Sequence, residues 1–279
     1  MKRRPLLMAS AAALAAPAVY ASGDVQQTKG PQGNPGDILN WPMLKVAYRT
    51  DKKSVKKLLP PGITPATDPV VRLTFYNFPV QGEPEYGIVV NVDASYDGIE
   101  GEYTLGIGID QESAIYISQE RWGQPKYYAD TQYFRLMNTV RARTTHRGYT
   151  FASFSGEVTG VVDNGPEFEQ NEWWLKYSRA VDLQPGHYDF PPHVVRVYSK
   201  YATAYKEKVD GVLTLSESPW DPIARLLPMR EQLDAYLWTP VFLDRKITLA
   251  GKLDPEAFWP HADTIGGSRW PGKDGGPLT

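Results

Sequence analysis

The amine of Lys126 is the group in this sequence that most directly suggests covalent chemistry. It ends the stretch Glu120-Arg-Trp-Gly-Gln-Pro-Lys126, in a chain rich in β-branched and aromatic residues. A primary amine condenses with a ketone or an aldehyde only in its neutral form, so desolvation or a nearby positive charge must lower its pKa from about 10.4. A lysine after a proline is more often an ordinary exposed loop residue. The surrounding pattern therefore has to separate an imine-forming amine from a surface lysine.

Other common kinds of site chemistry find no support in the sequence. It contains no cysteine, which excludes disulfides, thiolate catalysis, iron–sulfur clusters and cysteine-bound zinc. No Gly-x-Ser-x-Gly elbow is present, and Gly106-Ile-Gly108 predicts no dinucleotide site because we expect no helix after it. The histidines, which show no metal-ligand spacing, are His146, His187, His193 and His261. We therefore expect neither a metal nor a cofactor.

The N-terminal residues have the features of a signal peptide. Lys2-Arg-Arg4 precede an apolar run at residues 11–19, and small residues allow cleavage after Ala21. The pair Arg3-Arg4 also resembles a twin-arginine signal, so twin-arginine export and ordinary secretion both stay open. The apolar run is shorter than the about 20 residues that a spanning helix needs. We expect a periplasmic or secreted protein without membrane contact after removal of residues 1–21.

Composition divides the rest of the chain into three parts. Residues 22–40 contain few apolar side chains and should form a flexible leader, residues 41–255 should fold as one β-rich domain, and residues 256–279 should form an irregular tail. The formal net charge of −2 gives little attraction for phosphate backbones or anionic membranes. Nucleic acid is therefore not an expected partner.

Short runs of β-branched and aromatic residues between turn residues predict a largely antiparallel β fold. Connections at residues 97–98, 110–112 and 146–148 are short enough for hairpins, and we expect no βαβ series. Helices are expected at residues 51–59, with Asp51 as N-cap, and at residues 218–236, divided by Pro228. The expected strands are residues 43–49, 70–78, 86–96, 103–109, 114–118, 149–162, 173–181, 194–205, 212–215 and 241–249.

Five motifs, in order and with matching spacing, make the chain resemble the acetoacetate decarboxylase family over residues 43–250. Each motif is weak alone, but their shared order is specific, and Lys126 aligns with the lysine nucleophile of that family. The motifs are Tyr48-Arg49-Thr50-Asp51, Pro69-Val-Val-Arg72, Gly98-x-x-Gly101-x-Tyr103, Glu120-x-Trp-Gly-x-Pro-Lys126, and Gly211-Val-Leu-Thr-Leu-Ser216 followed by Asp221-Pro222 and Leu227-Pro228.

The resemblance implies a mainly β fold: a closed antiparallel β-barrel or cone with a few flanking helices, enclosing a dry pocket. In this family the lysine amine attacks a substrate ketone, and the protonated imine then accepts the electrons released when carbon dioxide or a proton leaves. The implied ligand is a small keto acid or another carbonyl compound. Assembly into a homo-oligomer is implied by the family alone.

The chain also departs from the family pattern. Tyr127 stands where decarboxylases have a second lysine, Thr74 replaces a glutamate, and Trp41 replaces an arginine. The pocket glutamate of the family aligns near Gly87 or Ile88, although Glu85 lies close enough to take its place. With these differences, decarboxylation, aldol and dehydration chemistry all stay open.

The resemblance and the residue types together give a candidate site. Tyr127 could act as an acid or a base near the imine. The aromatic candidates would line the pocket, and the two arginines would bind a substrate carboxylate. The candidate catalytic residues are Lys126, Tyr127 and Glu85, and the candidate substrate-binding residues are Trp122, Arg49, Arg121 and Phe75.

Two functions from different classes fit this pattern. The first is an exported Schiff-base enzyme of the decarboxylase, lyase or aldolase-dehydratase type. The second is a non-catalytic protein that binds a small molecule in the same pocket. A buried Lys126 without a neighbouring carboxylate would favour the enzyme, whereas an exposed or ion-paired Lys126 would favour the binding protein.

Overall fold

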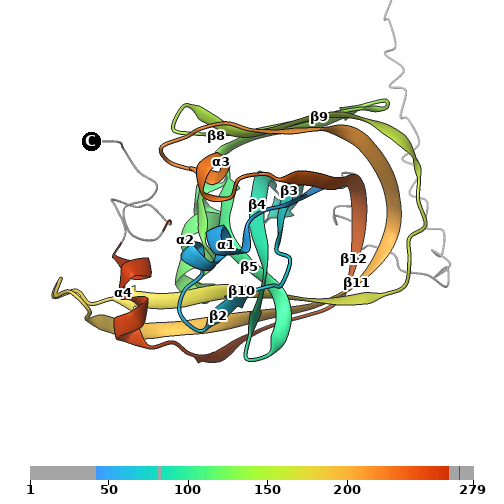
Figure 1. Cartoon of the computed structure of the whole chain (residues 1–279). Coiled ribbons are helices and arrows are strands. Elements are labelled where there is room, and N and C mark those ends of the chain that lie inside the picture. The colour runs from blue at the N-terminus through green and yellow to red at the C-terminus, as the bar shows by residue number, and fades with distance from the viewer. Residues whose placement is uncertain (1–41, 81–82, 264–269, 271–279) are drawn as a thin grey trace, which may run out of the picture. The chain divides into compact units, whose positions relative to one another are not determined.

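The computed structural model describes residues 42–80, 83–263 and 270 (Figure 1). These residues all fall within one compact unit, residues 31–279. The expected signal peptide, residues 1–21, and the expected leader, residues 22–40, lie outside the described residues. In the described part of the chain, no helix combines the length and the apolar character that crossing a membrane requires.

Strands dominate the fold, with four short helices among the described residues. The strands are β1 (Met43–Arg49), β2 (Ile63–Pro65), β3 (Val70–Val80), β4 (Glu83–Tyr96), β5 (Ile99–Ile109), β6 (Lys126–Tyr128), β7 (Asp130–Leu136), β8 (Thr139–His146), β9 (Tyr149–Val161), β10 (Phe168–Arg179), β11 (Tyr188–Leu215) and β12 (Glu231–Lys252). The helices are α1 (Lys52–Leu58), α2 (Glu112–Trp122), α3 (Ile223–Leu226) and α4 (Pro255–Ala262).

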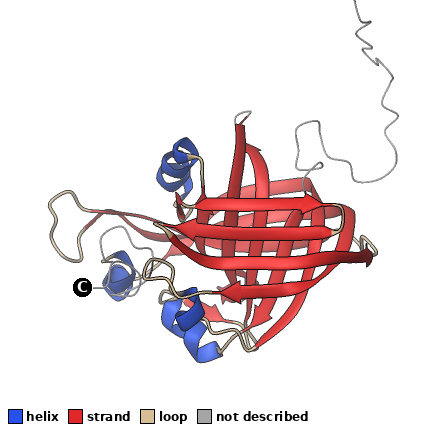
Figure 2. Ribbon diagram, turned by 90° about the horizontal axis from the view of Figure 1, so that it is seen from above, coloured by secondary structure: helices blue, strands red, loops and turns tan. Residues whose placement is uncertain are grey.

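Seven of these strands close into a ring. The sheet runs in the order β10-β5-β4-β3-β1-β12-β11-β9-β8-β7, and an additional pairing of β10 with β11 closes the first seven strands on themselves. All neighbours in the ring are antiparallel except β10 and β5. Figure 2 shows strands of the near and far sides of the molecule crossing one another, with the helices at the margin. The expected mainly β, closed antiparallel fold is confirmed.

Strand β1 shows how the two faces of the ring wall differ. Leu44, Val46 and Tyr48 are buried in the main apolar core. The alternate residues Met43 and Lys45 line a cavity. Successive side chains of a strand point to opposite faces, so this alternation separates an apolar face from a polar one. We call the space enclosed by the seven-stranded ring the lumen.

The same division continues along β3 and β4. Their core-facing residues belong to the same apolar cluster as side chains of β8, β9 and α1. Their lumen-facing residues line the cavity. The core-facing set is Val71, Leu73, Phe75, Ile88, Val90 and Val92, and the lumen-facing set is Thr74, Tyr76, Val89 and Asn91. Along these strands the main apolar core therefore lies outside the ring, and the lumen face carries both polar and apolar residues.

The segment before Lys126 is a helix, so the prediction of a strand at residues 114–118 is wrong. Helix α2 buries Ala114, Ile115 and Ser118, which recur with helical spacing, and exposes Tyr116 and Ile117. β-Branched and aromatic residues favour strands, but burial of one helical face overrides that weak preference. Because α2 follows β5 and β6 then pairs parallel to β5, one βαβ unit is present after all.

This unit also corrects the argument about Gly106-Ile-Gly108. A helix does follow these glycines, contrary to the expectation. The third glycine of a dinucleotide motif is still missing, because position 111 is Gln111. The turn expected at residues 110–112 joins β5 to α2 and does not form a hairpin.

Other elements differ from the expectations in length and type. Of the helix expected at residues 218–236, only α3 forms, and β12 already begins at Glu231. The two strands expected at residues 194–205 and 212–215 are one strand, β11, and α4 forms where we expected irregular chain. Strands β2, β6, β7 and β8 were not predicted. Pairing with neighbours decides these regions, and a local pattern does not contain that information.

Two predicted hairpins are confirmed. Asp97 and Gly98 join β4 to β5 with φ values of 51° and 73°. Arg147 and Gly148 join β8 to β9 with φ values of 49° and 85°. Positive φ at both central residues is the geometry of a tight hairpin turn. Helix α1 has Asp51 at its N-cap, as expected, but this carboxylate bonds Arg230 and makes no side-chain cap.

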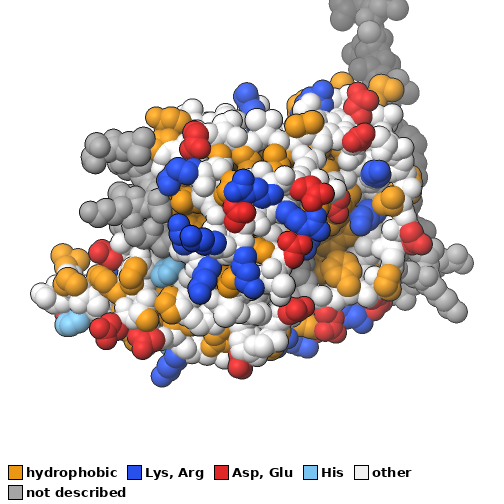
Figure 3. All heavy atoms as spheres, viewed as in Figure 1, with side chains coloured by type: hydrophobic (Ala, Val, Ile, Leu, Met, Phe, Trp, Pro, Cys, Tyr) orange, Lys and Arg blue, Asp and Glu red, His pale blue; other side chains and the backbone are white. Residues whose placement is uncertain are grey.

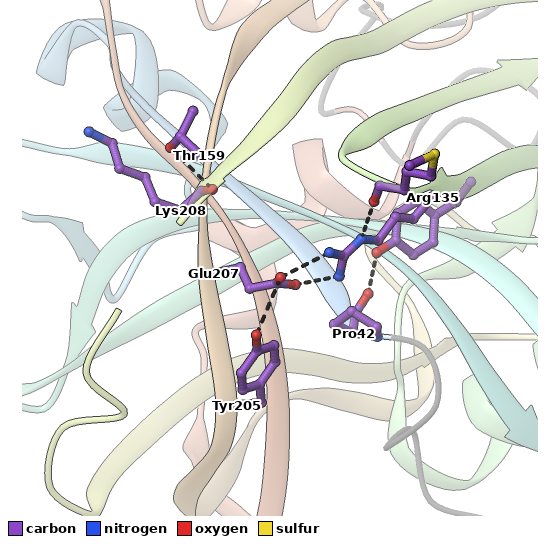
Figure 4. Close-up of polar contacts among 8 residues, drawn as sticks. Pro42, Arg135, Thr159, Tyr205, Glu207 and Lys208 are labelled. Atoms are coloured by element: carbon purple, nitrogen blue, oxygen red, sulfur yellow. Dashed lines mark hydrogen bonds and ion pairs between the residues drawn. The ribbon is translucent and has the colours of Figure 1, made fainter. Parts of the chain in front are cut away.

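An ion pair ties the outer edge of the sheet back to the ring. Figure 4 shows Arg135 of β7 reaching Glu207 of β11, although β8 and β9 separate these strands in the sheet order. Arg135 Nη2 donates to Glu207 Oε1 over 2.9 Å, and Nη1 donates to Oε2. The hydroxyl of Tyr133, also on β7, donates to the carbonyl of Pro42 just before β1. The strands β7, β8 and β9 thus curl back towards the ring.

Charged side chains of both signs are interspersed on one face of the molecule. On the face in Figure 3, Lys and Arg side chains lie next to Asp and Glu side chains. Among the ion pairs of exposed residues, Arg230 contacts Asp51 at 2.6 Å and Lys200 contacts Glu167 at 2.6 Å. This mixture matches the small net charge of −2.

Candidate active site

The turn between α2 and β6 brings Lys126 to the ring. Gly123 caps α2 with a φ of 66°, a left-handed conformation that favours glycine. A Cβ at Gly123 would lie 2.1 Å from the Leu175 carbonyl oxygen of β10, so the turn also needs the missing side chain. After it, β6 pairs parallel to β5 with Lys126 opposite Ile107. The Trp-Gly-x-Pro-Lys motif is therefore the connection that seats Lys126 in the sheet.

Lys126 is buried and ion-paired. Its side chain is 9% exposed, and its Nζ donates to both carboxylate oxygens of Glu85, over 3.2 Å and 3.0 Å. The hydroxyl of Tyr76 donates to Glu85 Oε1 over 2.8 Å. Burial, together with the adjacent Glu85 charge, raises the pKa of Tyr76 well above its usual range. The phenol therefore stays a donor, and Lys126, Glu85 and Tyr76 form one hydrogen-bonded group.

This group lies in a cavity of about 190 Å³ inside the lumen. Each of the seven ring strands contributes at least one lining residue, and β6 contributes Lys126. The lining residues are Met43, Lys45, Thr74, Tyr76, Glu85, Val89, Asn91, Ile107, Gln124, Lys126, Gln170, Glu172, Tyr201, Trp238, Phe242 and Arg245. The cavity is thus a mixed surface of apolar, amide and charged groups around one buried amine.

The sequence left open whether Lys126 is buried and whether a carboxylate lies beside it, and the structure shows both. The burial of Lys126 rules out the interpretation as an ordinary exposed loop lysine. The Glu85 carboxylate, however, lies beside the amine, which is the arrangement that we associated with a binding protein. A buried ion pair is costly to desolvate, so a fold retains it only with close geometry and further hydrogen bonds. Both functions therefore have to be judged on what this pair can do.

Tyr127 faces away from the Lys126–Glu85 pair. Its hydroxyl lies against Gly108, where a Cβ would come within 2.9 Å of it. Its ring contacts that of His146 at a centroid distance of 5.0 Å. Tyr127 lines another cavity, of about 370 Å³, which Lys126 also borders and which α4 reaches through Phe258 and His261. Burial lowers the pKa of His261 to about 4, so this histidine is neutral near pH 7.

The other candidate residues from the sequence lie outside the Lys126 cavity. Phe75 is fully buried in the apolar core on the opposite face of β3, and Trp122 packs against Trp174 of β10. Arg121 is exposed, with its guanidinium carbon 5.5 Å from the Trp122 ring centroid. Arg49 is on the surface, where it contacts Asp68 at 2.8 Å and Glu231 at 2.5 Å. Of the predicted site residues, the structure brings together Lys126 and Glu85.

Several lining residues of the cavity were not among the candidates, notably Tyr76, Lys45, Glu172 and Arg245. Burial lowers the pKa of Lys45, against the opposing charges of Glu102 and Glu172. Burial also raises the pKa of the Glu172 carboxyl, against the nearby Arg245 charge. The available signal was alternation: Lys45 and Tyr76 occupy the lumen-facing positions of strands whose other face is apolar.

No metal site accompanies this group. In the described part of the chain, no cluster of three or more His, Cys, Asp or Glu side chains could hold a metal ion. The cavity instead presents an amine, carboxylates, a phenol and amides. These groups can form and hydrolyse carbon–nitrogen bonds and transfer protons.

Comparison with known proteins places the chain in a family. The family model "Acetoacetate decarboxylase (ADC)" matches residues 20–253. A curated acetoacetate decarboxylase from Bordetella avium is 27% identical over 153 residues, which are 50% of this chain and 59% of that relative. The aligned region thus spans little more than half of the relative.

Solved structures show the same fold. A crystal structure of acetoacetate decarboxylase from Legionella pneumophila covers 76% of this chain and 84% of its own, with a TM-score of 0.63 and 20% identity. The enduracididine biosynthesis enzyme MppR, solved in complex with pyruvate, covers 74% of this chain and 87% of its own, with a TM-score of 0.59 and 13% identity. Because the family model matches most of the chain, the chain belongs to the acetoacetate decarboxylase family.

Proposed function

We propose that this protein is a Schiff-base enzyme that forms an imine between Lys126 and the carbonyl carbon of a small keto acid or related carbonyl compound. The observation that carries the proposal is the burial of the Lys126 amine inside a cavity large enough for a small ligand. The family supports the reaction class, since the curated relative from Bordetella avium is an acetoacetate decarboxylase.

The Lys126–Glu85 pair can supply the proton transfers of imine formation. Transfer of one proton from Lys126 Nζ to Glu85 across this 3.0 Å contact leaves a neutral amine, the form that attacks a carbonyl carbon, and a neutral acid. The amine nitrogen then bonds the carbonyl carbon, giving a carbinolamine. Glu85 returns its proton to the carbinolamine hydroxyl, which leaves as water, and the positively charged iminium remains beside the Glu85 carboxylate.

The iminium then accepts an electron pair from a neighbouring bond of the substrate. That bond is a carbon–carbon bond when carbon dioxide leaves and a carbon–hydrogen bond when a base removes a proton. Glu85 is within reach to move this proton, and the Tyr76 hydroxyl holds Glu85 in place at 2.8 Å. A lyase acting by decarboxylation or by aldol and dehydration steps fits these groups. The pyruvate complex of MppR supports a 2-oxo acid as one member of the substrate class.

Trapping with borohydride tests the proposal directly. The protein is incubated with a panel of keto acids and aldehydes in the presence of borohydride, and intact mass and peptide mapping locate any adduct. We expect a ligand-sized mass increase on the Lys126 peptide, its loss in Lys126→Ala, and its retention in Lys246→Ala. Lys246 is a suitable control because it is exposed and paired with Asp244. Equal adduct formation in Lys126→Ala would contradict the proposal.

A second function is favoured by the ion pair itself. If Glu85 holds Lys126 in its charged form permanently, the cavity binds a small molecule without covalent chemistry. Calorimetric binding of a keto acid, with no adduct across the panel, is the result expected for this binding protein. Trapping and calorimetry together therefore separate the enzyme from the binding protein.

Location is a further part of the proposal. We infer from residues 1–21 that the protein is exported and works in the periplasm or outside the cell. Cell fractionation followed by N-terminal sequencing tests this, and a mature chain beginning at Ser22 is expected. An uncleaved cytoplasmic chain would contradict it.

A further inference from the structure

The cavity that contains Lys126 adjoins a second and larger space on the side of Lys45. This second cavity has a volume of about 430 Å³. Lys45, Gln170 and Trp238 line both spaces, so they stand at the junction between them. Lys45 therefore lines the same cavity as Lys126 and also faces the larger space beside it.

Lys45 is a cation of the lumen without a direct acidic partner. Its Nζ lies 5.1 Å from the ring centroid of Trp238, a distance suited to a cation–π contact. Among the residues whose side chains the structure describes, 42–77 and 84–263, no carboxylate oxygen lies within ion-pair distance of the Lys45 amine. By contrast, Lys126 contacts Glu85 at 3.0 Å, and Arg72 contacts Asp93 at 2.7 Å. The Lys45 amine can therefore bind an incoming anion, whereas Lys126 and Arg72 already have acidic partners.

Glu102 and Glu172 are the acidic residues whose charges act on Lys45, and Glu102 already has other partners. Glu102 accepts a hydrogen bond from the Asn91 side chain over 2.7 Å and lies 3.5 Å from Arg72. Glu172 lies near Arg245, whose charge opposes the rise that burial causes in its carboxyl pKa. In the lining of the Lys126 cavity, three basic side chains face two acidic ones. The local field therefore favours an anionic ligand over a neutral or cationic one.

We propose that Lys45 binds the acid group of the substrate, and that the substrate is accordingly a keto acid whose carbonyl carbon reacts at Lys126. This inference rests on the proposed function for the reaction at Lys126. It adds the residue that distinguishes a keto acid from an uncharged ketone or aldehyde. The Trp238 ring holds the Lys45 amine at the junction of the two spaces, where it meets the acid group.

The experiment compares charged and uncharged ligands in Lys45→Met. Pyruvate and acetoacetate are each paired with their uncharged amides, pyruvamide and acetoacetamide, and the half-saturating concentration for borohydride trapping is measured. Loss of a charge-assisted contact should raise this concentration for the acids by about 10- to 150-fold in Lys45→Met. For the amides we expect a change of less than about twofold, because they make no charged contact with Lys45. Thermal unfolding confirms that the variants fold.

Lys246→Met is the matched control. Lys246 also lies over an aromatic ring, 5.7 Å from the centroid of Tyr198, but its side chain is 67% exposed and does not line the lumen. Its loss should change neither set of ligands. An unchanged half-saturating concentration for the acids in Lys45→Met would overturn the proposal. An equal loss for acids and amides would overturn it too, because Lys45 would then support the fold or Lys126.

A non-reactive ligand separates the failure of this inference from failure of the proposed function. Lactate and 3-hydroxybutyrate carry the acid group but no ketone, so calorimetry measures their binding without imine chemistry. Weaker binding of these acids to Lys45→Met than to wild type supports the role of Lys45 even if no keto acid is trapped. No binding to wild type, or equal binding to both, counts against Lys45 whatever happens at Lys126.

Discussion

The contact between Lys126 and Glu85 can serve catalysis or merely neutralise a buried charge. Both oxygens of Glu85 face the amine, and Tyr76 occupies one of them from the other side. A carboxylate in this position can remove a proton from the amine and return it to a leaving hydroxyl, whereas an amide cannot. The chemistry of position 85 therefore separates the two roles.

Replacement of Glu85 by Gln tests this role. The amide keeps an oxygen acceptor for Lys126 Nζ but cannot take up its proton, so the rate of borohydride-trapped adduct formation should fall by about 10²- to 10⁴-fold. Tyr76→Phe removes only the hydrogen bond to Glu85 and should have a smaller effect. Stopped incubations analysed by intact mass give both rates. If Glu85→Gln traps as fast as wild type, Glu85 only balances the charge of Lys126.

Sequence reasoning selected Lys126 because it aligns with the nucleophile of the family, and Glu85 because it lies close to the aligned position of the family's pocket glutamate. It also selected Phe75, which sits on the same strand as the lining residues Thr74 and Tyr76 but faces the core. A shift of one residue along a strand reverses the face, and a motif does not fix the face. Arg49 failed to reach the cavity for a different reason: Asp68 and Glu231 hold it on the surface.

At the scale of elements, the connection between α2 and β6 matters most, because it determines where Lys126 stands. It requires a left-handed residue at Gly123 and close approach to the β10 backbone at Leu175. Such a requirement can be read from the glycine in the motif, but the helix before it was mistaken for a strand. The residues of α2 include Ile115, Tyr116 and Ile117, which locally favour a strand. Tertiary burial of a single helical face decided the outcome.

Gly123→Ala should therefore destabilise the protein and displace Lys126. A left-handed alanine costs about 1 kcal/mol, and the clash with the Leu175 carbonyl oxygen should bring the total loss of unfolding free energy to about 2–4 kcal/mol. Gly98→Ala is the matched control, since Gly98 has a φ of 73° but nothing within 4 Å of an added Cβ. Urea unfolding measures both variants. Equal losses would show that the contact with β10 carries no cost.

At the scale of the whole molecule, ring closure assembles the cavity. Residues from β1 and β12, almost 200 positions apart in the sequence, pair directly: Met43 lies opposite Trp238. The alternation of β1, β3 and β4 predicts two unlike faces, but it does not predict which strands will meet across the lumen. The family resemblance predicted closure but not the strand order, and the ring closes because β10 pairs with β11 at the other end of the seven-strand path. Local patterns contain no equivalent signal.

Strand β11 belongs both to the ring and to the curled sheet of β9, β8 and β7, and the Arg135–Glu207 pair connects these two parts (Figure 4). The Glu207 side chain is 5% exposed, so loss of Arg135 leaves a nearly buried carboxylate without its partner. Breaking a fully buried pair costs about 3–5 kcal/mol. Because the Arg135 side chain is 32% exposed and water can reach the site, we expect Arg135→Met to lose about 2–3 kcal/mol of unfolding free energy.

The double variant Arg135→Met/Glu207→Met should be more stable than Arg135→Met, since it also removes the unpaired carboxylate. Arg230→Met provides the control: its partner Asp51 lies on the surface, with side chains 60% and 41% exposed, so its loss should cost less than about 1 kcal/mol. Urea unfolding of the three variants gives the comparison. If Arg135→Met costs no more than Arg230→Met, the pair does not hold the curled sheet to the ring, and the packing of β7 against β3, β4 and β5 holds it instead.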